Sequence, residues 1–172
     1  MITPLLALLL ATLPAHDKFG DTGALVPSGG IGLFHGSGTT TFSFSPQVQY
    51  FVAPNVAVGV GLTYAHQAGD NAPTFDSYGG LVSFGVNLPF GEQLSIFPSV
   101  FFTGVHTSIS GSAFVIGGPS SAIGAAVFVP LLFHPVPHMF LGFGPEFATS
   151  GPSSDLFHDQ AVSLHTIIGA WF

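Results

Sequence analysis

The eight histidines are the residues of this chain whose chemistry is most open, because only one lysine or arginine accompanies them. Four of them, His35, His66, His106 and His158, fall at the ends of apolar segments or in the polar connections between them. Such a group could ligate a metal ion, or form a rim that gains positive charge as pH falls through about 6.5. No His pair has the spacing of helical metal ligands. The sequence therefore favours polar aromatic side chains over a metal site.

A carboxylate within an otherwise apolar segment is the second candidate. Glu146 is the only acid inside an expected strand, and no lysine or arginine is available to pair with it there. A buried carboxylate needs a partner or becomes protonated. The candidate hydrogen-bond partners are His165, Gln47 and Gln49 from other strands. A structural role for this polar set is favoured over a catalytic one.

A nucleophilic constellation is also conceivable, since His106 and Ser108 lie two residues apart and Glu146 could supply the acid. Residues at alternate positions of a strand share a face. Alternation places His106 on the apolar face of its segment and Glu146 on the small, polar face of another, so the two should not meet. No catalytic residue, no metal ligand and no cofactor is predicted.

The chain that must position these residues is unusually poor in charge. Charged residues make up 5% of it, against roughly 25% in an ordinary soluble domain. A soluble domain covers its surface with Lys, Glu, Arg and Asp, so the outer surface of this chain is predicted not to face water. A nucleic-acid partner is excluded because phosphate binding needs cations. The absence of cysteine excludes disulfides and thiolate metal sites.

The first residues, MITPLLALLLATLPA, contain an apolar run from Leu5 to Leu13. It is too short to span a bilayer, which needs ~20 residues, and it has the length of the core of a signal peptide, although the usual positive start is missing. We expect a signal peptide over residues 1–15, cleaved near Ala15. One domain over residues 16–172 should follow.

Alternation with period two predicts the elements of that domain. In residues 41–52, TFSFSPQVQYFV, one face carries mainly Phe, Val and Tyr, and the other carries mainly Thr, Ser and Gln. Ala53-Pro54-Asn55 is a turn signal, and residues 56–65, VAVGVGLTYA, alternate again. Segments of about ten residues are long enough to cross a bilayer at a tilt. These two segments are therefore predicted to be membrane-crossing strands of one hairpin.

Further segments of this kind cover residues 78–88, 94–104, 122–133, 139–147 and 162–172, and a first strand is expected at 29–35. Short connections at 54–55, 89–93 and 134–137 alternate with longer ones at 66–75, 106–120 and 150–159, as in outer-membrane barrels. Because no other segment resembles a transmembrane helix, a closed barrel remains the way to satisfy the backbone in lipid. The predicted fold is all-β, an eight-stranded antiparallel up-and-down transmembrane β-barrel.

The two faces of these strands predict its surroundings. The apolar face should meet acyl chains, and the face of Gly, Ser, Thr, Ala and Gln should fill a narrow interior. Aromatic residues near the strand ends are expected to form interfacial girdles: Tyr50, Tyr64, Tyr78, Phe90, Phe133, Trp171 and Phe172.

The stretch FSPQVQYFVAPNVAVGVGLTY resembles the second and third strands of the small outer-membrane β-barrel family, the OmpA/OmpX-type barrels. The ending LHTIIGAWF resembles the C-terminal assembly signal of that family, with the signal residues Leu164, Ile168, Ala170 and Phe172, although the usual interior glycine is displaced to Gly169. The resemblance covers roughly residues 29–172. It implies a monomer in the outer membrane of a Gram-negative bacterium, with outer-membrane lipids and the barrel-assembly machinery as partners.

The leading function is a non-enzymatic integral membrane barrel, structural, surface-interacting or narrowly porous, whose outside loops carry any specificity. One alternative is a lipid-modifying barrel enzyme. Some eight-stranded barrels that deacylate lipid A use a His, a Ser and a Glu on the lipid-facing wall, but the longer motif around those residues is absent here. A second alternative is a soluble lipid-binding β-barrel, against which the low charge content argues.

Overall fold

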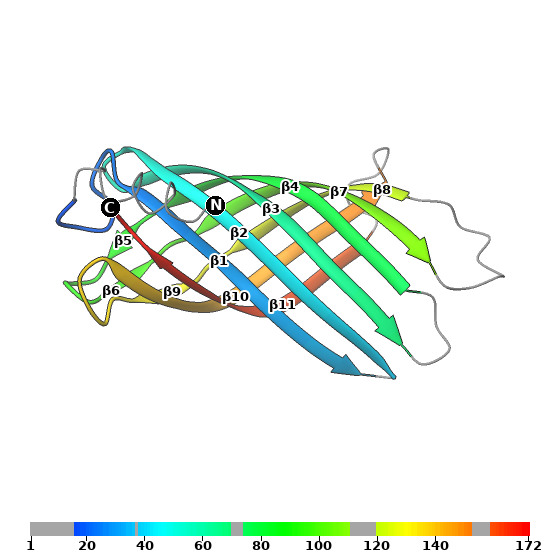
Figure 1. Cartoon of the computed structure of the whole chain (residues 1–172). Coiled ribbons are helices and arrows are strands. Elements are labelled where there is room, and N and C mark those ends of the chain that lie inside the picture. The colour runs from blue at the N-terminus through cyan, green and yellow to red at the C-terminus, as the bar shows by residue number, and fades with distance from the viewer. Residues whose placement is uncertain (1–15, 37, 70–73, 111–119, 153–158) are drawn as a thin grey trace, which may run out of the picture.

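The computed structural model describes residues 16–36, 38–69, 74–110, 120–152 and 159–172, which form a barrel of antiparallel strands (Figure 1). The predicted signal peptide lies outside these residues. The strands are β1 (Leu25–Gly36), β2 (Thr39–Ala53), β3 (Val56–Gly69), β4 (Thr74–Val86), β5 (Leu88–Pro89), β6 (Leu94–Ile96), β7 (Ser99–Ser110), β8 (Ser120–Phe128), β9 (Leu131–Phe133), β10 (Met139–Pro152) and β11 (Asp159–Ala170).

The strands follow one another around the barrel in chain order. β1, β2, β3, β4, β7, β8, β10 and β11 each pair with the next, and β11 returns to β1. The short strands β5, β6 and β9 continue β4, β7 and β8 at one end, where β9 also pairs with β10. The predicted eight-stranded antiparallel barrel is therefore confirmed.

Two of the breaks between strands, from β6 to β7 and from β8 to β9, fall at prolines. Pro98 and Pro130 have no N–H to donate, so the ladder continues there through their carbonyl oxygens. The Val86 N–H donates to the Pro98 oxygen at 3.0 Å, and the Phe97 N–H donates to the Pro130 oxygen at 3.1 Å. The segments 94–104 and 122–133, each predicted as one strand, are divided at these positions.

Several strands are longer than predicted. β1 begins at Leu25 rather than at Gly29, and β3, β4, β7 and β10 run into residues predicted as loops. Thr74 still pairs with Ser110. The loop predictions were wrong there because backbone pairing continues along a hairpin after the side chains stop alternating between apolar and small.

The outer wall is apolar along the strands. Leu62 is 65% exposed, Phe84 55% and Phe143 54%, whereas the inward Gln49 is 2% exposed and Ser83 1%. This is the predicted arrangement of faces. No helix in the described part of the chain is long and apolar enough to cross a membrane.

The two ends of the barrel differ. Residues 16–24 and Phe172 lie at one end, which we call the terminal end. The last residues of β1 and β3 and the first residues of β2 and β4 lie at the other, the loop end (Figure 1). The buried apolar cluster is at the terminal end and includes Val26, Phe51, Phe97, Leu132, Phe140 and Trp171.

Candidate functional site

Polar and aromatic side chains gather on the outward face near the loop end. We call this set the outer collar: Tyr64, His66, Asp76, Tyr78, His106 and Ser108. They come from β3, β4 and β7, where the alternation that turns Leu62, Val82 and Phe102 outward continues to these positions. The collar thus follows directly on the apolar wall.

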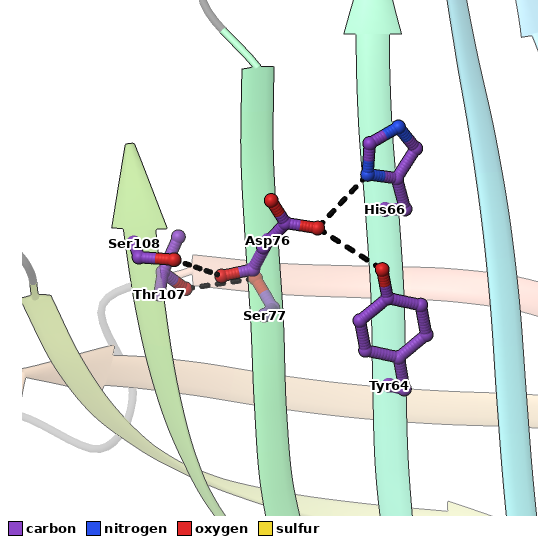
Figure 2. A network of polar contacts seen from close by, with 6 residues as sticks. All are labelled: Tyr64, His66, Asp76, Ser77, Thr107 and Ser108. Atoms are coloured by element: carbon purple, nitrogen blue, oxygen red, sulfur yellow. Dashed lines mark hydrogen bonds and ion pairs between the residues drawn. The ribbon is translucent and has the colours of Figure 1, made fainter. Parts of the chain in front are cut away.

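Asp76 is the centre of the collar (Figure 2). Its Oδ1 accepts a hydrogen bond of 3.0 Å from the Tyr64 hydroxyl and lies 2.9 Å from His66 Nδ1. The Ser108 hydroxyl donates to the Asp76 carbonyl oxygen at 3.3 Å. The His66 and Asp76 side chains are 42% and 36% exposed, so in water their pair would contribute little to stability. Its place, where the wall changes from apolar to polar, suits the headgroup level of a bilayer.

The predicted rim histidines lie where the sequence placed them, as far as they are described. His106 Nδ1 is 3.1 Å from Ser121 Oγ, and its ring centroid is 5.3 Å from that of Tyr78. His35 Nδ1 is 2.8 Å from Thr40 Oγ1. His158 lies outside the described residues. Within the described ranges, no group of three or more His, Asp or Glu side chains is placed to hold a metal ion.

The hypothetical triad is not assembled. Ser108 bonds to a main-chain oxygen of β4, and Glu146 faces the interior, where it lines the lumen. The structure instead brings Asp76 to His66, a pairing that was not predicted from the sequence. The two are cross-strand partners of the β3–β4 hairpin, so correct strand register would have found them.

The predicted lumen residues do face inward, in two groups. Glu146 Oε1 lies 3.6 Å from His165 Nε2, which also lies 2.9 Å from Ser163 Oγ. Gln47 is 8% exposed, and Gln49 is 2% exposed and donates to Ser83 Oγ at 3.5 Å. Glu146 and His165 therefore lie within ion-pair distance but, at 3.6 Å, beyond hydrogen-bond distance, while Gln49 bonds to Ser83.

A glycine makes room for the buried glutamine. A Cβ at Gly59 would stand 2.6 Å from Gln49 Cγ and 2.5 Å from Ser83 Oγ. Any larger residue would displace one of these side chains. The small residues of the sequence pattern thus leave space for a few longer ones in the narrow interior.

An aromatic cluster closes the terminal end, and we call it the aromatic plug. The centroid of the Phe19 ring lies between 5.2 and 5.6 Å from the centroids of five other rings. They belong to Phe51, Phe97, His134, Phe140 and Trp171. Asn87 Nδ2 donates to the Phe19 carbonyl oxygen at 3.2 Å and to Asn55 Oδ1 at 2.9 Å, which ties the Phe19 segment to two turns.

The plug was not predicted from the sequence, and the prediction that Trp171 belongs to an interfacial girdle was wrong, because this residue is 4% exposed. The sequence did contain a signal for the plug. Phe51, Phe97, Phe140 and Trp171 all occupy inward positions of their segments, and all lie near connections at the same end. Aromatic residues at inward positions of that end fill the barrel where small residues would leave it open.

Comparison with known proteins rests on structure. No protein-family model matches the chain, and no curated protein matches it in sequence. The fold is similar to that of Neisserial surface protein A, with a TM-score of 0.62 and 14% identity over 87% of this chain and 96% of that one. The chain has the fold of the small outer-membrane β-barrels.

Two further barrels support that statement. The N-terminal β-barrel domain of OprF from Pseudomonas aeruginosa gives a TM-score of 0.57 at 11% identity, over 90% of this chain and all of that one. The outer membrane protein Ail of Yersinia pestis, in a phospholipid bilayer nanodisc, gives 0.52 at 14% identity, over 88% of this chain and 100% of that one. At these identities the likeness concerns the fold. It confirms at that level the resemblance seen in the sequence, and it agrees with a place in the bacterial outer membrane.

The predicted assembly-signal residues lie on the last strand of the barrel and at its end. Leu164 is 68% exposed and Ile168 55%, both on the outward face that Ala170 shares. The Phe172 N–H donates to the Leu25 oxygen at 3.0 Å, which fixes the chain end to β1. Recognition of these residues by an assembly machinery stays a prediction.

Acid is expected to weaken the terminal end through His134, which lies just after β9, beyond the barrel strands. Burial lowers the pKa of His134 below its usual 6.5. The unfolded chain therefore binds a proton more readily at this position, and the free energy of unfolding should fall as pH drops through 6.5. Denaturant midpoints measured in lipid vesicles above and below pH 6.5 should show this loss. The loss should shrink in His134→Phe.

His35→Gln is the matched control, since His35 lies at the loop end and outside the plug. It should keep the pH dependence of the wild type. An equal acid-induced loss in His134→Phe and in the wild type would contradict the assignment to His134.

Proposed function

We propose that this protein is a non-enzymatic integral protein of the bacterial outer membrane that is closed to through-flow. The observation that carries the proposal is the apolar outward wall on a closed ring of strands, with Leu62 65% exposed and Phe84 55% exposed. In water such a wall would drive aggregation, whereas in a bilayer it meets acyl chains. The protein then works as a monomer in contact with outer-membrane lipids, placed there by the barrel-assembly machinery.

The aromatic plug supports a closed rather than a porous barrel. Phe19 and its ring partners fill the terminal end, and Trp171, Phe51 and Phe140 are each less than 5% exposed. The lumen therefore ends in packed side chains rather than in an aperture. Any surface role falls to the loop end, where the outer collar lies.

The two alternatives find less support. A soluble lipid-binding barrel needs polar side chains outside and apolar ones inside, which is the reverse of the faces described above. A deacylase of the kind considered needs its nucleophile beside an imidazole, and the Ser108 hydroxyl instead donates to the main chain of Asp76. Ser108→Ala should accordingly leave the lipid A mass spectrum of the host unchanged.

Gel mobility and conductance test the proposal together. The membrane fraction should contain a band that migrates faster unheated than boiled, as folded outer-membrane barrels do. The purified protein in planar bilayers should give no sustained conductance. A protein that stayed monomeric in buffer without detergent would overturn the membrane placement. Steady channel currents from the intact protein would overturn the closed lumen.

A further inference from the structure

The barrel is closed by a seam between β1 and β11 that is paired over only part of its length. Backbone hydrogen bonds of 3.0 Å join Leu25 and Phe172, and the strand pairing continues to Ser28 with Gly169 and Gly29 with Ile168. No further pairing joins the two strands within the described residues. Along its other edge each strand is fully paired. β1 pairs with β2 as far as Gly36, and β11 pairs with β10 as far as Asp159. Toward the loop end the two strands run apart (Figure 1).

Side-chain exposure agrees with an open seam. Leu33 is 76% exposed, Val162 71%, Ile31 70% and Leu164 68%, the four highest values among the large apolar residues described. All four lie on the outward face of β1 or β11 beyond the last pair. Each of them has a paired strand on one side only, whereas Val82 at 46% and Leu62 at 65% stand between two paired strands.

The sequence of β1, LVPSGGIGLFHG, accounts for the weakness of the seam. Gly30 and Gly32 take inward positions, so they offer no side chain to pack across to β11. A Cβ built on Gly30 would lie 3.4 Å from the Thr166 oxygen, so the strands still approach each other there. Cross-strand side-chain pairs stabilise a sheet, and this strand has few to give.

Two cavities meet at the seam. One of about 610 Å³ is an apolar hollow on the outward side, with Phe143 and Ile168 among its walls. The other, of about 640 Å³, is the lumen, which reaches Leu81, Phe101, Phe128 and Glu146. Both are lined by Gly30, Ile31, Thr166 and Ile167. The lumen also includes the outward residues Leu33 and Leu164, so it continues sideways to the lipid-facing surface.

An open seam needs an occupant in a membrane. Backbone N–H and C=O groups without partners are costly in lipid, and the plug closes the terminal end of the lumen. The lumen has the volume of a small-molecule site. Its apolar wall of Leu81, Phe101 and Phe128 suits an alkyl chain, and Glu146, Ser163 and His165 beside the seam suit a hydrogen-bonding head. The only lysine or arginine of the chain, Lys18, lies before β1. An anionic head would therefore meet the Glu146 carboxylate without a lysine or arginine to offset it.

We propose that the β1–β11 seam is a lateral opening through which the lumen takes a single-chain amphiphile with a cationic or uncharged head from the bilayer. The inference rests on the proposed function, because it requires the barrel to stand in a membrane. The alkyl chain lies against Leu81, Phe101 and Phe128. The head bonds at Glu146 and His165, and through the seam it reaches the unpaired edges of β1 and β11.

Two neighbouring phenylalanines provide a matched test in bilayer nanodiscs. Phe101 faces the lumen and Phe102 is outward and 48% exposed. Each is replaced by tryptophan, one at a time, in a Trp171→Phe background, and the folded state is checked by gel mobility. The probes are a nitroxide-labelled long-chain amine and a fatty acid with the same labelled chain. Both probes should quench Phe102→Trp. The amine should also quench Phe101→Trp, and the fatty acid should quench it several-fold less.

A disulfide across the seam identifies the route of entry. Extending the register of Ser28 with Gly169 and Gly29 with Ile168 places Leu33 opposite Leu164. The chain has no cysteine, so Leu33→Cys with Leu164→Cys can form only this bridge within one molecule. Oxidation should remove the quenching of Phe101→Trp by the amine and leave that of Phe102→Trp unchanged. Reduction should restore it.

The outcomes separate the possible failures. Absence of quenching at Phe102→Trp would overturn the membrane placement itself. Quenching at Phe102→Trp with none at Phe101→Trp would overturn the lateral opening alone, and quenching that survives oxidation would place the entrance at the loop end. Equal quenching by amine and fatty acid would overturn the assignment of the head. Disulfide-linked dimers of the single variant Leu33→Cys in the membrane would make a second copy of the chain the occupant.

Discussion

Phe19→Ala is expected to lower the free energy of unfolding by about 3 kcal/mol, at the low end of the range for a deleted phenylalanine ring because Phe19 is only half-buried. The ring contacts five others at the terminal end, and each favourable aromatic pair adds to the loss of apolar burial. Denaturant unfolding of the protein in lipid vesicles measures the change.

The only tryptophan gives a local readout of the same substitution. Trp171 is 4% exposed, and its ring centroid lies 5.6 Å from that of Phe19. Its emission should shift to longer wavelength in folded Phe19→Ala because water reaches the indole. Phe90→Ala is the matched control, since Phe90 is 63% exposed and belongs to no aromatic pair of the plug. If both variants unfold at the same denaturant concentration, with unchanged Trp171 emission, the plug does not stabilise the barrel.

Val82→Arg is expected to destabilise the barrel by about 2–4 kcal/mol, whereas Val52→Arg should cost about 0–1 kcal/mol. Both valines point outward, with exposures of 46% and 48%. Val82 lies midway along the apolar run of β4 from Tyr78 to Val86, so its arginine would stand in the middle of the hydrocarbon layer. Val52 lies at the turn between β2 and β3, where an arginine reaches the interface.

Unfolding of the two variants in vesicles of one lipid composition provides the measurement. The difference between them matters more than either value, because the substitution and the outward orientation are the same. Equal costs at the two positions would mean that no hydrocarbon layer surrounds β4. Stabilisation by arginine at both positions would place the wall in water.

The candidate site could be predicted from the sequence only in part. Alternation put His106 on the outward face and Glu146 and His165 on the inward one, and the structure has these side chains on those faces. His35 and His66 were predicted only to lie at strand ends or in loops, and both lie on strands near the loop end. Alternation did not predict the contacts of Asp76 with His66 or of Ser108 with the Asp76 backbone. Those contacts depend on strand register, and toward the loop end the residues of these strands no longer alternate between apolar and small. A shift of the strand register by one residue would turn every side chain of the strand to the opposite face. No local feature of the sequence fixes that register here.

The sequence by itself determined the strand number, the antiparallel order and which face meets lipid, because the period of two acts within each strand and needs no partner. Only the tertiary structure decided what closes the barrel. Phe19 meets Phe51, Phe97, Phe140 and Trp171 because strands distant in the sequence end at the same level. The seam likewise ends at Gly29 and Ile168 because of how the first and last strands meet after the whole ring has formed. The plug and the seam both depend on contacts between elements that are far apart along the chain, and no local sequence pattern encodes such contacts.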